Sequence, residues 1–141
     1  MALILISHGN MAIETKKSAE LIIGELPNSA ALGLQKSDGP DTLKEKVETE
    51  IKKYYGKEPV YVIVDLLGGT PGNVVVNLTQ KYPDMHVVSG LNLPMVINYA
   101  NQMFVSKELD ISALMKEGKD GIVDVNAFLN QTSDDDDEED E

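Results

Sequence analysis

Two side chains stand out for the chemistry that they could perform together. His8 comes just after the apolar run at residues 2–6 and precedes Gly9, so we expect it at an exposed turn between a strand and a helix. Asp65 directly follows a second apolar run, at residues 60–64, where an unpaired carboxylate would be costly to bury. If the two strands are neighbours, Asp65 could accept a hydrogen bond from one ring nitrogen of His8 and leave the other as an acceptor or nucleophile. The alternative is that each side chain only caps the backbone of its own turn.

A glycine-rich turn begins three residues after Asp65. Gly68 and Gly69 would let the backbone approach a ligand closely, while Thr70 is a good N-cap and Pro71 a good first helical residue. The free amides and the dipole at such a helix start favour an anion, although the turn matches neither a Walker loop nor a dinucleotide fingerprint. An anion beside a nucleophilic imidazole suggests a phosphohistidine.

The composition excludes other kinds of chemistry. Twelve lysines and no arginine stand against 24 acidic residues, for a net charge of −12, so we expect no nucleic-acid partner. Cysteine is absent, which removes thiol catalysis and thiolate zinc sites, and the remaining histidines and carboxylates show no zinc spacing. We therefore expect neither a metal nor a cofactor, and we interpret the second histidine, His86, as a structural or surface residue.

Apolar runs alternate along the chain with amphipathic stretches. Strands are predicted at residues 3–6, 29–34, 60–64 and 86–89, with a last short strand at residues 122–125. Helices are predicted at about residues 12–26, 43–54, 71–82, from 93 onward and 111–117. This alternation predicts an α/β fold, namely an open, mainly parallel sheet with helices on both faces.

The acidity of the chain is concentrated at its end. The last eight residues are all acidic, and without them 16 acidic residues would face the 12 lysines, for a net charge of −4. We expect one domain over residues 1–130 and a disordered acidic tail over residues 131–141. The first apolar run is too short for a signal sequence or a membrane span, so a cytoplasmic protein is expected.

Ligands of open α/β sheets bind beyond the carboxyl ends of the strands. The three polar or glycine-rich strand ends here resemble motifs of the mannose-class IIA components of the sugar phosphotransferase system. The motifs are Ser-His-Gly (residues 7–9), Val-Asp-Leu-Leu-Gly-Gly-Thr-Pro-Gly-Asn (residues 64–73) and Gly-Leu-Asn-Leu-Pro-Met (residues 90–95). The resemblance covers residues 2–125, and the motifs occur in the order of the family.

The resemblance assigns roles by position. His8 matches the phosphorylated histidine of the family, Asp65 the carboxylate paired with it, and Thr70 the residue beside the phosphate. Gly68, Gly69 and Pro71 would complete the phosphate-binding turn. The other motif residues that we expect in the site loops or at a partner are Ser7, Gly9, Asn73, Asn92, Leu93 and Pro94.

The resemblance also implies a phosphotransferase that acts between proteins. The chain would take a phosphoryl group from phosphohistidine on the carrier protein HPr, hold it on Nε2 of His8 and pass it to a IIB component. The membrane components IIC and IID would be indirect partners. Family members form homodimers that exchange a C-terminal strand, which would fit residues 122–125.

Other functions remain open at this point. One is a non-catalytic regulatory or interaction module with the same fold. Another is the phosphocarrier subunit of dihydroxyacetone kinase, which shares the fold and the first-strand histidine. That family lacks the Gly-Gly-Thr/Ser-Pro block and has serine after the histidine, where this chain has Gly9. A weaker third possibility is an enzyme that binds a free phosphorylated metabolite.

Overall fold

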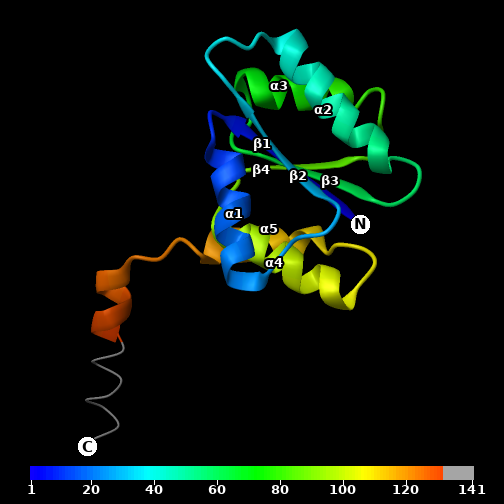
Figure 1. Ribbon diagram of the computed structural model, residues 1–141. Coiled ribbons are helices and arrows are strands. Elements are labelled where there is room, and N and C mark those ends of the chain that lie inside the picture. Colours follow the sequence, from blue (N-terminus) through cyan, green and yellow to red (C-terminus); the bar gives the residue numbers. More distant parts are fainter. Residues whose placement is uncertain (132–141) are drawn as a thin grey trace, which may run out of the picture.

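The computed structural model describes residues 1–131 and has a parallel sheet at its centre (Figure 1). Its elements, in chain order, are β1 (Ala2–His8), α1 (Met11–Ile23), β2 (Ser29–Leu34), α2 (Pro40–Tyr54), β3 (Val60–Val64), α3 (Gly69–Leu78), β4 (His86–Ser89), α4 (Leu93–Val105) and α5 (Ile111–Asp120). The strand order is β2-β1-β3-β4, and every pair is parallel. The α/β fold and the four main strands predicted from the sequence are confirmed, and β1 and β3 are central neighbours.

The helices cover both faces of the sheet. Figure 1 shows α2 and α3 on one side and α1, α4 and α5 on the other. Alternate residues of β1 enter different cores: Leu3 and Leu5 pack with the α1, α4 and α5 side, whereas Ile4 and Ile6 pack with the α2 and α3 side. Burial on both faces explains why the central strands are continuously apolar.

The segment after α5 differs from the prediction. Residues 122–124 form no regular structure, and a helix runs from residue 125 to residue 131, so the short strand expected at residues 122–125 is wrong for this single chain. Asp124 accounts for the difference, because its Oδ1 accepts the Ala127 N–H at 3.1 Å, which is the hydrogen bond of a helix N-cap. In Figure 1 this segment leads away from the sheet.

The predicted acidic tail lies outside the described residues, apart from Gln131. Within residues 1–131, no helix has both the length and the apolar character that a membrane crossing requires.

Candidate functional site

His8 and Asp65 meet at the carboxyl ends of the two central strands. The Asp65 N–H donates to the Ile6 carbonyl at 3.1 Å, which extends the pairing of β1 and β3 by one residue. Oδ2 of Asp65 accepts the backbone N–H of His8 at 2.9 Å and lies 2.7 Å from Nδ1 of its ring. The structure thus contains the contact between ring and carboxylate that the sequence suggested.

The surroundings of Asp65 keep its carboxyl group ionised. Burial raises the pKa of Asp65, but hydrogen bonds from the His8 backbone, the His8 ring and the Leu66 backbone outweigh it, so the pKa lies below its usual value. The Leu66 N–H occupies the other oxygen, Oδ1, at 2.9 Å. An ionised carboxylate can only accept hydrogen bonds, so in the neutral ring Nδ1 of His8 carries the proton and Nε2 has the lone pair.

The two side chains differ in exposure. Asp65 is 9% exposed and His8 is 47% exposed. The carboxylate is therefore a buried support, and the ring that it orients faces the solvent. The arrangement suits a nucleophile that must be reached by another large molecule.

The start of α3 lies against the reactive edge of the His8 ring. Gly69 is the first residue of α3, with φ +73°, and a Cβ placed on it would lie 3.0 Å from Cε1 and 3.2 Å from Nε2 of His8. Only glycine leaves this space open, and the first-turn amides of α3 have no partners within the helix. An anion bound at Nε2 would face these amides and the positive end of the helix dipole.

Two details of the predicted phosphate-binding turn are wrong. Thr70 is not the N-cap of α3, and Pro71 is not its first residue, because the helix begins at Gly69 with Gly68 as its cap. The reason is that Gly68 and Gly69 both adopt a positive φ, of +92° and +73°. The chain can therefore turn into the helix before it reaches Thr70. Thr70 instead lines a hollow of about 270 Å³ between α2 and α3, together with Asn73.

Two predicted residues beside His8 shape its turn. Ser7 is fully buried, and its Oγ accepts the Ala12 N–H at 2.7 Å, so it satisfies a free amide at the start of α1. Gly9 adopts φ +55° and donates its N–H to Leu34 at 2.8 Å. Ser7 and Gly9 thus fix the path of the backbone on either side of His8.

The predicted residues at the end of β4 have structural contacts. Oδ1 of Asn92 accepts the Met95 N–H at 3.0 Å, which caps α4, and its Nδ2 donates to the Gly118 carbonyl at 2.9 Å. Leu93 is the first residue of α4, and Pro94 packs where a side chain on Gly121 would lie. Neither Asn92 nor Asn73 has a hydrogen bond to His8 or Asp65 among those of residues 1–131.

Sequence reasoning missed three exposed apolar side chains that follow His8 and Asp65 closely in the sequence. Met11 is 46% exposed, Leu66 60% and Leu67 81%. The turn that carries the two leucines lies close against α3, because a Cβ on Gly72 would lie 2.8 Å from the Leu66 carbonyl oxygen. Two leucines within a glycine-rich turn were the available signal, since apolar residues that cannot enter the core from such a turn indicate a contact surface.

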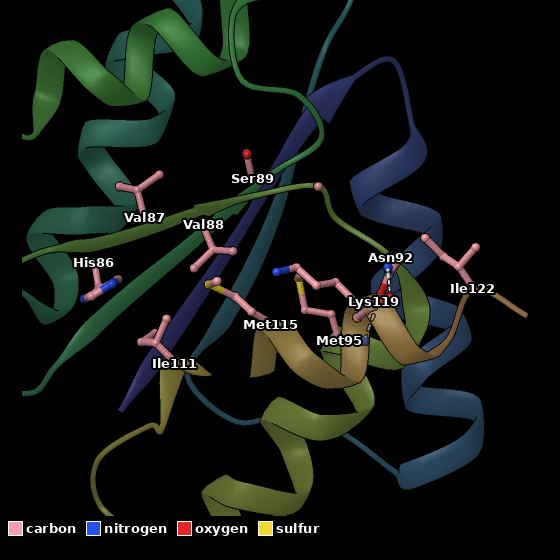
Figure 2. A pocket seen from close by; sticks show the side chains of 12 residues that line it. His86, Val87, Val88, Ser89, Asn92, Met95, Ile111, Met115, Lys119 and Ile122 are labelled. Atoms are coloured by element: carbon pink, nitrogen blue, oxygen red, sulfur yellow. Dashed lines mark hydrogen bonds between the residues drawn. The ribbon is translucent and has the colours of Figure 1, made fainter. Parts of the chain in front are cut away.

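A further hollow lies away from the His8 pair, between β4 and α5. It measures about 410 Å³, and Figure 2 shows Met115 and Lys119 reaching from α5 toward Val88 on β4. Of the predicted site residues only Asn92 lines it. No group of three histidine, aspartate or glutamate side chains that could hold a metal ion occurs in the described part of the chain.

A family model and two similar relatives point to the same family. The model of the family described as "PTS system fructose IIA component" matches residues 2–117. The sorbose-specific EIIA component of Lacticaseibacillus casei is 35% identical over 120 residues, which cover 82% of this chain and 84% of the relative. The fructose-specific EIIA component of Bacillus subtilis is 32% identical over 97 residues, which cover 69% of this chain and 66% of the relative.

A solved structure agrees with these relatives. The mannose/sorbose-specific IIA subunit of Enterococcus faecalis superposes with a TM-score of 0.76 at 37% sequence identity, and the match covers 86% of this chain and 92% of that one.

Proposed function

Since the chain belongs to the mannose-class family of IIA components of the sugar phosphotransferase system, we propose that it accepts a phosphoryl group from phospho-HPr on Nε2 of His8 and passes it to a IIB component. The observation that carries the proposal is the 2.7 Å contact between Nδ1 of His8 and Oδ2 of Asp65, which leaves Nε2 free beside the start of α3. The membrane components IIC and IID would be reached only through IIB.

The bonds and charges of the proposed transfer balance without an added proton donor. The lone pair of Nε2 attacks the phosphorus atom of the donor phosphohistidine, and the donor N–P bond breaks with its electron pair returning to the donor imidazole. The Nδ1 proton stays between His8 and Asp65, and the carboxylate charge stabilises the imidazolium character of the phosphorylated ring. Delivery to IIB is the same displacement, with Nε2 as the leaving atom.

The bound phosphoryl group would be held mainly by neutral groups. The backbone N–H groups of Gly69 and Thr70 in the first turn of α3 are its natural partners, and Thr70 could add its hydroxyl group. The chain has no arginine for this purpose.

The apolar surface around His8 favours a protein partner over a free metabolite. Met11 begins α1 three residues after His8, and Leu66 and Leu67 directly follow Asp65. A protein docked at this pair would cover these exposed side chains and exclude water. A small phosphorylated metabolite would leave them exposed.

The test is to mix the protein with phosphoenolpyruvate, enzyme I and HPr, and then with a IIB component. We expect an acid-labile phosphoryl group that mass spectrometry locates on His8 and that disappears when IIB is added. A phosphorylated protein that delivers nothing to any mannose-class IIB would favour a regulatory module. A protein that takes up no phosphoryl group would contradict the proposal.

The Gly69→Ala variant tests the role of the space beside Nε2. We expect phosphoryl uptake to slow by about tenfold, because the added methyl group meets the reacting edge of His8 and displaces it. Gly24→Ala is the matched control, since Gly24 also has a positive φ (+88°) but nothing lies within 4 Å of the added Cβ. Both variants should be destabilised by about 1 kcal/mol through backbone strain. Equal rates in the two variants would show that the space beside His8 is unimportant.

We also propose a homodimer. The outer edge of β4 has no partner strand among the described residues, and apolar side chains of α4 and α5 flank it, among them Met95, Ile111 and Met115. Several side chains after α5 are also exposed and apolar, namely Ile122, Val123, Val125, Phe128 and Leu129. The C-terminal segment of a second copy would cover this edge; a monomer mass in sedimentation equilibrium would contradict it.

A further inference from the structure

We propose that Gln35 is a positioning residue for His8, acting through Asn10 on the turn that carries the histidine. The inference rests on the proposed function, because it concerns how accurately Nε2 is placed for transfer. Asp65 holds His8 from β3, on one side of β1. The contacts of Gln35 show that the end of β2 holds the same turn from the other side.

The backbone of the turn is in close contact with the end of β2. His8 lies opposite Leu34 in the pairing of β1 with β2, and the Gly9 N–H donates to the Leu34 carbonyl at 2.8 Å. The Gly9 carbonyl oxygen occupies the place where Gly33 would carry a side chain, because a Cβ there would lie only 1.8 Å from it. Gly33 therefore allows β2 to approach the histidine turn more closely than any other residue could.

The Gln35 side chain completes this contact. Its Nε2 donates to Oδ1 of Asn10 at 2.9 Å and reaches the Gly33 carbonyl at 3.3 Å. One amide group thus joins the end of β2 to the last residue before α1. Asn10 occupies the N-cap position of α1, yet its side chain makes no capping hydrogen bond to the helix. Among the hydrogen bonds of residues 1–131, the Asn10 side chain takes part only in the bond to Gln35.

The backbone of Gln35 is itself bound by the loop that leads to α2. Its backbone N–H donates to Oδ2 of Asp38 at 2.9 Å, and Oδ1 of Asp38 lies 3.8 Å from Nζ of Lys46. The hydrogen bond to Asn10 therefore starts from a residue whose own backbone N–H is hydrogen-bonded.

The consequence for transfer is geometric. Phosphoryl transfer between two imidazoles needs the attacking nitrogen, the phosphorus and the leaving nitrogen in line, and small displacements of the attacking atom reduce the rate. Asp65 fixes the rotation of the His8 ring. The contacts of Gln35 and Gly33 fix the backbone from which the ring projects.

The test compares Gln35→Ala with Gln80→Ala, whose glutamine is also exposed but lies just after α3 and has no side-chain hydrogen bond in the described residues. We expect Gln35→Ala to lower kcat for phosphoryl uptake from phospho-HPr by about fivefold, with KM and the melting temperature unchanged. Gln80→Ala should match the unaltered protein. An unchanged kcat would overturn the proposal, and so would a raised KM alone, which would make Gln35 a partner contact.

A double-variant cycle tests whether Asn10 and Gln35 act through the hydrogen bond between them. Asn10→Ala and Gln35→Ala delete the same hydrogen bond, so the double variant should be no slower than the slower single variant. Effects that multiply would contradict the shared role.

A second measurement does not depend on activity. NMR order parameters of the Gly9 and Asn10 amides should fall in Gln35→Ala and not in Gln80→Ala. If the unaltered protein accepted no phosphoryl group, the proposed function would fail, while the order parameters would still decide whether Gln35 holds the turn.

Discussion

The His8→Ala variant should take up no phosphoryl group from phospho-HPr, whereas His86→Ala should be labelled like the unaltered protein. The reason is that, in the proposed mechanism, His8 supplies the attacking lone pair. His86 is the matched control because it is the other histidine of the chain, is also exposed and lies at the start of β4. The readout is acid-labile phosphate after incubation with phosphoenolpyruvate, enzyme I and HPr.

The His8→Ala variant should still fold. The His8 side chain is 47% exposed, and the backbone N–H of residue 8 can keep its 2.9 Å hydrogen bond to Asp65. We expect a loss of about 1 kcal/mol in the free energy of unfolding, from the hydrogen bond between ring and carboxylate. Circular dichroism and a denaturant titration would check this. Labelling of folded His8→Ala at the normal rate would place the phosphoryl group elsewhere and overturn the proposed mechanism.

The Asp65→Asn variant should keep the fold and slow phosphoryl uptake on the order of a hundredfold. An asparagine oxygen can accept a hydrogen bond from the ring, but it carries no charge to stabilise the phosphorylated imidazole. It also no longer enforces the tautomer with the proton on Nδ1, because an amide group can equally donate to that nitrogen. Stopped-flow or quenched-flow measurement with excess phospho-HPr would give the rate. An unchanged rate would remove Asp65 from the mechanism.

The same variant should alter the response to acid. Because the folded state lowers the pKa of Asp65, its ionised carboxylate stabilises the fold above the ordinary aspartate pKa of about 4, and this contribution is lost as the pH falls through the lower folded-state value. Asp65→Asn lacks this contribution. The difference in unfolding free energy between the unaltered protein and Asp65→Asn should therefore become smaller below about pH 4. A difference that stays constant with pH would show that the carboxylate does not contribute in this way.

The sequence was sufficient for the sheet and for the central pair of the site. Residues 60–64 are continuously apolar because β3 is covered on both faces, and this is the pattern that identifies a central strand. His8 and Asp65 each follow such a strand, so their meeting required only that β1 and β3 be neighbours. The structure shows this order.

Alternative local structures and contacts between distant residues explain what the sequence did not predict. Thr70 has the chemistry of an N-cap, but the preceding glycines can adopt a positive φ, and the helix begins before it. The apolar residues at 122–125 resemble a strand, but Asp124 caps a helix instead. The contact between Gln35 and Asn10 joins polar side chains 25 residues apart, and no periodicity marks such a pair. These features depend on tertiary distances that a pattern in one sequence does not contain.

The neutral surroundings of Nε2 have an energetic consequence. The chain has no arginine, and no ion pair of the described residues joins a lysine to His8 or Asp65. Backbone dipoles would therefore stabilise a phosphoryl group on His8 only moderately, and its free-energy minimum would be shallow. Receipt and delivery would then have equilibrium constants near unity. The direction of flow would follow the ratio of charged donor to empty acceptor, and the chain would work as a reversible relay.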